Sequence, residues 1–279
     1  MKTKYYFLLI IAVLLLPAWA FLYFLLVKTY FNYQYLGYEP EVASFKTIEV
    51  NKPLAKKIPV LMYHYVEINQ DKNDYKRDSL NNNPYIFEKQ MVTLKNAGYK
   101  FIWMSEVEQA LKDKSGQKYI AITFDDGYES FYSQTYPFIK KHGIKVTNYL
   151  IYSSIGKLNY MSKPQIQKIY SEGLLEIGSH TLDHPDLRAF SDEEVRRQLI
   201  SSKKYLEKDF GVSVVSFCYP YGFFNEKTIS LVKEAGYKNA TTTQLGSVVY
   251  EDKLQTISRI RPGIKTDQEL LKYLDSINY

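Results

Sequence analysis

Short apolar segments alternate with segments of helical periodicity from about residue 58 to the C-terminus. The apolar segments have the length and composition of buried strands. They cover residues 59–66, 101–104, 119–124, 146–152, 175–178, 214–219, 239–243 and 257–260. Several of the helical segments between them begin at a capping residue: Ser105, Ser162, Ser191 and Asn225. The alternation predicts an α/β fold with a parallel sheet, either closed into a barrel or doubly wound. Residues 69–84 are polar and rich in Asn and Asp, and we expect them to form a long loop.

Unusual polar residues follow the predicted strands directly. They occur in three clusters, at residues 122–127 (ITFDDG), 179–185 (SHTLDHP) and 217–222 (FCYPYG). In a parallel sheet of either kind, the active site lies at the carboxyl ends of the strands. The sequence therefore predicts that these clusters belong to one active site.

Two adjacent carboxylates, Asp125 and Asp126, end a hydrophobic strand, and Gly127 lets the chain turn sharply. Neighbouring residues on an extended chain point in different directions. One acid can therefore ligate a metal ion while the other accepts a proton. A DDG sequence by itself more often marks a strand end with an Asp-Gly turn than a catalytic or metal site.

The second cluster contains His180 and His184, two of only four histidines in the chain. We expect one helical turn here, ended by Pro185, which places both imidazoles on one face. Two histidines and one aspartate make three protein ligands with an open position, the catalytic pattern for zinc or a similar ion. Such an ion lowers the pKa of a bound water from 15.7 to about 7, so a nearby carboxylate suffices as general base. The site would suit hydrolysis of an amide or ester. Histidines at this spacing are, however, more often surface residues.

The third cluster offers backbone N–H groups and aromatic rings but no carboxylate. By itself it indicates only a loop after a strand.

Taken in order, TFDDG, H-T-x-x-H-P and Y-P-Y-G resemble the motifs of the polysaccharide deacetylases of the NodB-homology type, carbohydrate esterase family 4. The motifs span residues 122–222, and the fold pattern is similar over about 58–275. The resemblance implies a distorted (β/α) barrel. It also implies metal-dependent removal of acetyl groups from N-acetylglucosamine.

The resemblance also implies roles for individual residues. Asp125 would be the general base, and the metal would be held by Asp126, His180 and His184. Zinc suits these ligands best, and cobalt, nickel or iron would also fit. On the substrate side the motifs place Thr181, Tyr219, Pro220 and Tyr221. Thr181 would brace the histidine loop, and the backbone N–H of Tyr221 would help to hold the oxyanion.

The sequence departs from the family pattern at the residue that orients the base. The third motif commonly has an arginine where Cys218 stands, and cysteine cannot replace it. Arg259 or Arg261, beside a late predicted strand, would supply the charge instead. The alternative is that both are ordinary surface arginines.

A second departure concerns the general acid. The family usually has a late histidine, but none follows His184. His142 precedes Gly143 at a predicted helix end and is expected to be a capping or surface residue. His64 ends the first predicted strand, so we assign it as the general acid. The alternative is a structural histidine bonded within the barrel.

The strand Met62-Tyr63-His64 resembles the subgroup that deacetylates poly-β-1,6-N-acetyl-D-glucosamine, a biofilm exopolysaccharide. That polymer is therefore the predicted substrate, and the family resemblance further implies a polysaccharide synthase or export system as partner. Two alternatives stay open. The polymer could be peptidoglycan or a chitooligosaccharide, or the chain could be a non-catalytic, membrane-tethered sugar-binding module.

The N-terminal sequence indicates that the chain is attached to the cell membrane. Residues 5–27 form a run of 23 residues without a charge, and at 1.5 Å per residue such a helix spans about 34 Å, enough for a bilayer core. Lys2 and Lys4 precede it, so the positive-inside rule places the rest of the chain outside the cell. We expect an uncleaved single-pass anchor over residues 1–28, a tether over 29–57 and the deacetylase domain over 58–279. Secretion after signal cleavage near residues 18–20 is the alternative.

Charge and cysteine content exclude other classes. The formal charge of +6 falls to +3 once residues 1–28 are removed, which is too little for a nucleic-acid-binding face. A single cysteine excludes an intramolecular disulfide and a zinc site built from cysteine pairs. Tyrosine is abundant, with 27 residues. Those near the motifs are candidates for a sugar-binding rim: Tyr63, Tyr65, Tyr128, Tyr219 and Tyr221.

Overall fold

The computed structural model describes residues 57–69, 71, 73–246 and 253–277. The predicted anchor (1–28) and all of the predicted tether except Lys57 lie outside these residues. Among the described helices, none is both long and apolar enough to cross a membrane.

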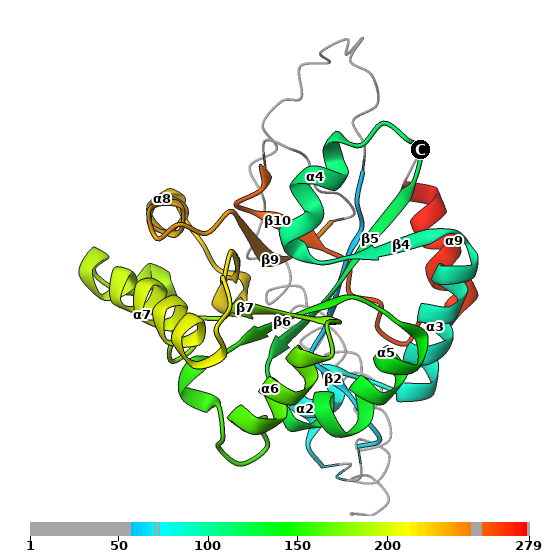
Figure 1. The fold of residues 1–279 in the computed structure, drawn as a ribbon, viewed down its shortest axis with the longest axis horizontal. Helices are drawn as coiled ribbons and strands as arrows, with labels where there is room; N and C mark the ends of the chain where they lie inside the picture. The colour runs from blue at the N-terminus through cyan, green and yellow to red at the C-terminus, as the bar shows by residue number, and fades with distance from the viewer. Residues whose placement is uncertain (1–56, 70, 72, 247–252, 278–279) are drawn as a thin grey trace, which may run out of the picture. The chain divides into compact units, whose positions relative to one another are not determined.

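The centre of the fold is an eight-stranded sheet with the order β1-β5-β6-β7-β8-β9-β10, in which β4 also pairs with β5 (Figure 1). Every pairing is parallel. The strands are β1 (Val60–Tyr63), β4 (Tyr99–Ile102), β5 (Lys118–Asp126), β6 (Val146–Leu150), β7 (Leu175–Ser179), β8 (Ser216–Cys218), β9 (Asn239–Leu245) and β10 (Ile257–Arg259). Each overlaps a strand predicted from the sequence.

The last strand returns to the first, so the sheet is nearly closed. Leu61 and Ile260 form an isolated parallel bridge. The N–H of Met62 donates to Ile260 O, and the N–H of Ile260 donates to Val60 O, both at 2.8 Å. Of the two arrangements that the alternation allowed, the structure therefore has the barrel.

Helices flank the sheet, with α3 and α9 packed together on one side (Figure 1). The helices that follow the strands are α3 (Pro84–Asn96), α4 (Val107–Lys112), α5 (Tyr136–His142), α6 (Lys163–Ser171), α7 (Asp192–Phe210), α8 (Glu226–Glu234) and α9 (Asp267–Ile277). The predicted caps Ser162, Ser191 and Asn225 are confirmed, because each side chain accepts a backbone N–H of the first turn. The cap predicted at Ser105 is wrong. Ser105 lies inside a 3₁₀ turn (Met104–Glu106), and Glu106 instead bonds the N–H of Trp103.

The loop predicted over residues 69–84 is also wrong in part. It contains the short helix α2 (Tyr75–Ser79) and the strand β3 (Asn81–Asn82), which pairs in parallel with β2 (Tyr65–Val66). Asp74 caps α2 by accepting the N–H of Arg77 at 2.9 Å. Arg77 also forms an ion pair with the buried carboxylate of Glu67, so this segment is ordered by local polar contacts rather than by apolar periodicity.

Strand residues alternate between two apolar clusters. The larger cluster includes Leu61, Ile122 and Phe217. Their chain neighbours Val60, Ala121 and Cys218 belong to the smaller one. Contacts from the smaller cluster's side join strands that are not neighbours in the sheet, such as Tyr149 Oη in β6 with Ser216 Oγ in β8 at 2.8 Å. This face is therefore the filled interior of the barrel.

Gly178 in β7 makes room for the ring of Tyr149 inside the barrel. A Cβ atom at position 178 would overlap Cδ1 and Cε1 of that ring. We expect Gly178→Ala to lower the free energy of unfolding by about 1–3 kcal/mol, the usual cost of overpacking a core. Urea unfolding measures it, with the exposed Ser213→Ala as a control that changes stability by less than about 0.5 kcal/mol. Equal stability of Gly178→Ala and the unchanged protein would show that Tyr149 does not occupy this space.

Candidate metal centre and active site

The predicted site residues meet at the carboxyl ends of the strands. Asp125 and Asp126 end β5, Cys218 ends β8 and Arg259 ends β10. The remaining polar residues follow strands directly: His64 after β1 and His180 after β7.

Asp126, His180 and His184 form a group that can hold a metal ion. Nε2 of His180 lies 3.5 Å from Asp126 Oδ1, and Nε2 of His184 lies 3.7 Å from the same oxygen. Nδ1 of His180 is 2.7 Å from the carbonyl oxygen of Cys218. A proton on Nδ1 donates to that carbonyl and leaves Nε2 free to ligate, the usual arrangement of metal-binding histidines. The donor set therefore fits a divalent ion.

The loop between the two histidines differs from the prediction. Residues 180–184 form no helical turn, because Thr181 (φ 67°) and His184 (φ 60°) are left-handed. Thr181 Oγ1 accepts the N–H of His184 at 2.9 Å and so fixes the turn. Gln198 in α7 accepts the N–H groups of Leu182 and Asp183 at 3.0 and 3.2 Å. The sequence analysis missed Gln198, because its role depends on the packing of α7 against this loop.

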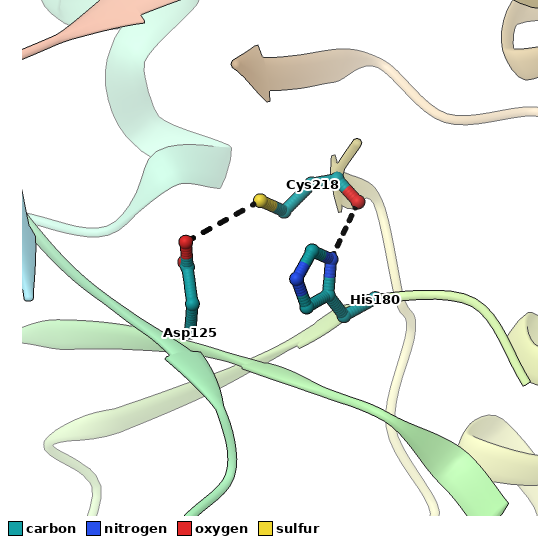
Figure 2. Close-up of side chains that lie close together, drawn as sticks. All are labelled: Asp125, His180 and Cys218. Atoms are coloured by element: carbon teal, nitrogen blue, oxygen red, sulfur yellow. Dashed lines mark hydrogen bonds between the residues drawn. The ribbon is translucent and has the colours of Figure 1, made fainter. Parts of the chain in front are cut away.

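Asp125, His180 and Cys218 form a second group of potential ligands (Figure 2). A metal ion does not fit there. Nη2 of Arg259 lies 2.7 Å from Asp125 Oδ2 and 3.3 Å from Cys218 Sγ, so a cation already occupies this position. Nδ1 of His180 is also committed to the Cys218 carbonyl.

Arg259 and Asp125 form a buried, two-point ion pair. Their exposed fractions are 0% and 2%, and the Nη1–Oδ1 and Nη2–Oδ2 distances are both 2.7 Å. The other N–H groups of Arg259 donate to Thr242 O, Thr123 Oγ1 and Cys218 Sγ. Burial alone would raise the pKa of Asp125, but the guanidinium holds it well below its ordinary value. Of the two candidate arginines, Arg259 is the one beside Asp125, the predicted base; Arg261 is exposed, and none of the described contacts joins it to Asp125.

His64 faces the same carboxylate. Its Nε2 lies 3.7 Å from Asp125 Oδ2, and its side chain is 13% exposed. Burial lowers the pKa of His64, and the nearby carboxylates of Asp125 and Asp126 oppose this only partly. His142 lies elsewhere, at the end of α5, where Nε2 contacts Glu88 Oε1 at 2.7 Å.

The third motif bounds the site on another side. Tyr221 has a left-handed backbone (φ 58°), and its ring stands edge-on to the ring of His184 at 4.5 Å. Tyr219 and Pro220 are buried beside it. A cavity of about 310 Å³ is lined by His64, Asp125, His184, Tyr221 and Tyr128, together with Tyr160. The sequence analysis did not predict the lining residues Lys76, Tyr160, Asp183 and Thr243. Lys76, Tyr160 and Thr243 lie outside the three motifs, and Asp183 occupies a position that the second motif leaves open.

Comparisons with known proteins agree with this geometry. A family model described as polysaccharide deacetylase matches residues 112–240. The Bacillus subtilis protein YxkH, whose name assigns it to the polysaccharide deacetylases, is 30% identical over 221 residues, or 78% of this chain and 75% of YxkH. The chain belongs to the polysaccharide deacetylase family.

Other relatives of this deacetylase carry more specific names. The poly-beta-1,6-N-acetyl-D-glucosamine N-deacetylase of Staphylococcus aureus is 29% identical over 206 residues, or 69% of this chain and 71% of the relative. The Streptococcus pyogenes deacetylase PplD, solved in complex with acetate, has a TM-score of 0.74 and 30% identity, and the match covers 78% of this chain and 98% of PplD. The chain is therefore an enzyme, a carbohydrate N-deacetylase.

Arg259 and Arg261 give contrasting predictions in this deacetylase. We expect Arg259→Ala to leave a buried, unpaired carboxylate, to lower the free energy of unfolding by about 3–5 kcal/mol and to reduce acetate release. Arg261→Ala, at an exposed position, should change stability by less than about 0.5 kcal/mol. Arg259→Lys keeps the charge but not the two-point geometry, so its free energy of unfolding should lie between those of the unchanged protein and Arg259→Ala. Chemical unfolding and acetate assays of the three variants measure these effects.

The loss of stability in Arg259→Ala should depend on pH. Because the folded-state pKa of Asp125 is lowered, the pair stabilises the protein above the unfolded pKa of about 3.9, and this contribution is lost as pH falls. The difference in unfolding free energy between the unchanged protein and Arg259→Ala should therefore be largest near neutral pH and shrink below about pH 4. A difference that stays constant with pH would contradict the ion pair.

Proposed function

We propose that this deacetylase removes acetyl groups from N-acetylglucosamine residues of poly-β-1,6-N-acetyl-D-glucosamine, with a divalent metal ion, zinc most of all, held by Asp126, His180 and His184. The observation that carries the proposal is His64, directly after β1, with Nε2 3.7 Å from Asp125 Oδ2. It supplies a histidine beside the proposed base in a sequence that has no histidine after His184. The Staphylococcus aureus relative named for that polymer supports the choice of substrate.

Asp125 is proposed as the general base that accepts a proton from the attacking water. Arg259 keeps the carboxylate ionised and fixes its plane, so an oxygen is ready to accept the proton. A carboxylate with a lowered pKa is a weak base. A metal ion, when bound, supplies a Lewis acid for the acetyl oxygen and lowers the pKa of water to about 7, which brings the proton within reach of Asp125.

His64 is proposed as the general acid that protonates the leaving nitrogen. Burial favours its neutral form, so it needs a proton during the reaction. Asp125 Oδ2 lies 3.7 Å from His64 Nε2, so the proton taken from water can pass to the imidazole after a small shift. The N–H of Tyr221 would donate to the oxyanion as it forms. The products are acetate and a glucosamine residue with a free amine.

The proposal includes the placement predicted from the sequence. The uncharged run over residues 5–27 supports a membrane anchor with the catalytic domain outside the cell. A synthase or export partner rests on the family resemblance alone.

Acetate release from three substrates tests the proposed function. We expect release from β-1,6-linked N-acetylglucosamine oligomers to exceed release from β-1,4-linked oligomers and from peptidoglycan, and a chelator to abolish it. Faster release from β-1,4-linked oligomers or from peptidoglycan would identify that polymer as the substrate instead of poly-β-1,6-N-acetyl-D-glucosamine. No release from any of them would favour a sugar-binding module.

His64→Ala separates proton donation from metal binding. We expect zinc affinity close to that of the unchanged protein and a fall in turnover of about 10²–10⁴-fold, the usual contribution of a general acid. His184→Ala should instead weaken zinc binding, because it removes a ligand. His142→Ala is the matched control, since His142 pairs with Glu88 away from the cavity. Full turnover in His64→Ala would rule out the assignment.

A further inference from the structure

Two exposed aromatic rings lead outward from the metal centre. Tyr221 and Phe223 are 52% and 43% exposed. The ring of Tyr221 contacts the ring of His184, with centroids 4.5 Å apart, and the ring of Phe223 lies 5.9 Å from that of Tyr221 at 36°. Together Tyr221 and Phe223 form a strip, here called the aromatic ledge, that starts at a metal-ligand candidate and continues beyond the cavity. Phe223 itself does not line the cavity.

The backbone of the ledge is held in a strained conformation. Tyr221 has φ 58° and ψ 0°, a left-handed conformation that is unfavourable for a bulky residue. Its carbonyl oxygen accepts Thr243 Oγ1 at 2.8 Å. Gly222 follows with φ 74°, and a Cβ atom there would overlap the backbone and side chain of Thr243. Strain of this kind persists where the surrounding structure enforces it, commonly at functional sites.

A second loop fixes the outer end of the ledge. The guanidinium of Arg188 lies 4.0 Å from the centroid of the Phe223 ring. Arg188 is in turn held by Asp186, with Nε–Oδ1 at 3.0 Å and Nη2–Oδ2 at 2.7 Å. Asp186 belongs to the loop that carries His184. The metal-ligand loop and the ledge are therefore linked at two points, at Tyr221 through His184 and at Phe223 through Arg188.

These contacts identify what the ledge can bind. Rigid, exposed aromatic rings favour an apolar flat surface, and the face of a pyranose ring presents C–H groups of this kind. A polymer whose reacting residue enters the cavity must continue along its rim. We propose that the aromatic ledge binds a neutral N-acetylhexosamine ring of the same polymer, next to the residue that is deacetylated. The inference rests on the proposed function for the identity of the reacting residue.

The test compares a long substrate with a short one. The specificity ratio is kcat/KM for the β-1,6-linked tetramer of N-acetylglucosamine divided by kcat/KM for an aryl acetate ester, both with metal-loaded protein. Phe223→Ala should lower this ratio about tenfold, as expected for loss of one stacked ring, with the change mainly in KM for the tetramer. Phe223→Tyr should restore the ratio. The matched control is Tyr273→Ala, which removes another surface ring, 37% exposed, from α9.

A binding measurement keeps the inference independent of turnover. In metal-loaded His64→Ala protein, titration calorimetry with the tetramer should show binding about tenfold weaker when Phe223→Ala is added. Unchanged binding, or no binding in either protein, would overturn the inference that the aromatic ledge binds a sugar ring. A protein that hydrolyses the ester but no tetramer would overturn the proposed function, and the titration would still decide the ledge. If Phe223→Ala and Tyr273→Ala lower the ratio equally, the effect is general destabilisation and the inference is wrong.

Discussion

The buried ion pair between Arg259 and Asp125 is the interaction around which the active site is arranged. Removing two charges from water costs several kcal/mol per ion, and only close and complete hydrogen bonding offsets that cost. Arg259 meets this condition, because each of its N–H groups has an acceptor within the barrel. The carboxylate consequently stays ionised in one orientation. That orientation directs one oxygen towards His64 and leaves the neighbouring Asp126 for the metal group.

Barrel closure places these groups together. Arg259 ends β10 and His64 follows β1, strands that stand near opposite ends of the described chain. They become neighbours because Ile260 exchanges hydrogen bonds with Val60 and Met62. An open sheet with the same strands would leave Asp125 without its counter-ion, although His64 would stay beside it because β1 pairs directly with β5. Folding of the C-terminal strand is thus a condition for the chemistry as well as for stability.

More of the fold than of the site geometry could be predicted from the sequence. Apolar periodicity and helix caps are local signals, so the strands and most helices follow from the sequence. The motifs likewise gave the residues of the metal group. Loop geometry did not follow: Thr181 and His184 are left-handed, although their spacing is typical of a helical turn. The choice between Arg259 and Arg261 also could not be made. Residues two apart on an extended strand share a face, so alternation does not separate these two arginines. They differ because β10 ends at Arg259, whose side chain is buried, whereas Arg261 lies past the end of the strand and is exposed.

The small side chain of Cys218 and the guanidinium of Arg259 together fill the space beside the carboxylate of Asp125. Cys218 Sγ lies 3.3 Å from Nη2 of Arg259 and 3.7 Å from Oδ2 of Asp125, so the space beside the carboxylate is filled. An arginine at 218 would have to displace the existing guanidinium. It would also bring a second positive charge within about 4 Å, a repulsion of about 4 kcal/mol at an effective dielectric constant of 20. The two positions are therefore coupled: an arginine at either one requires a small, uncharged neighbour at the other. This coupling explains how the chain can lack the usual arginine of the third motif and still hold Asp125, its proposed base, in place.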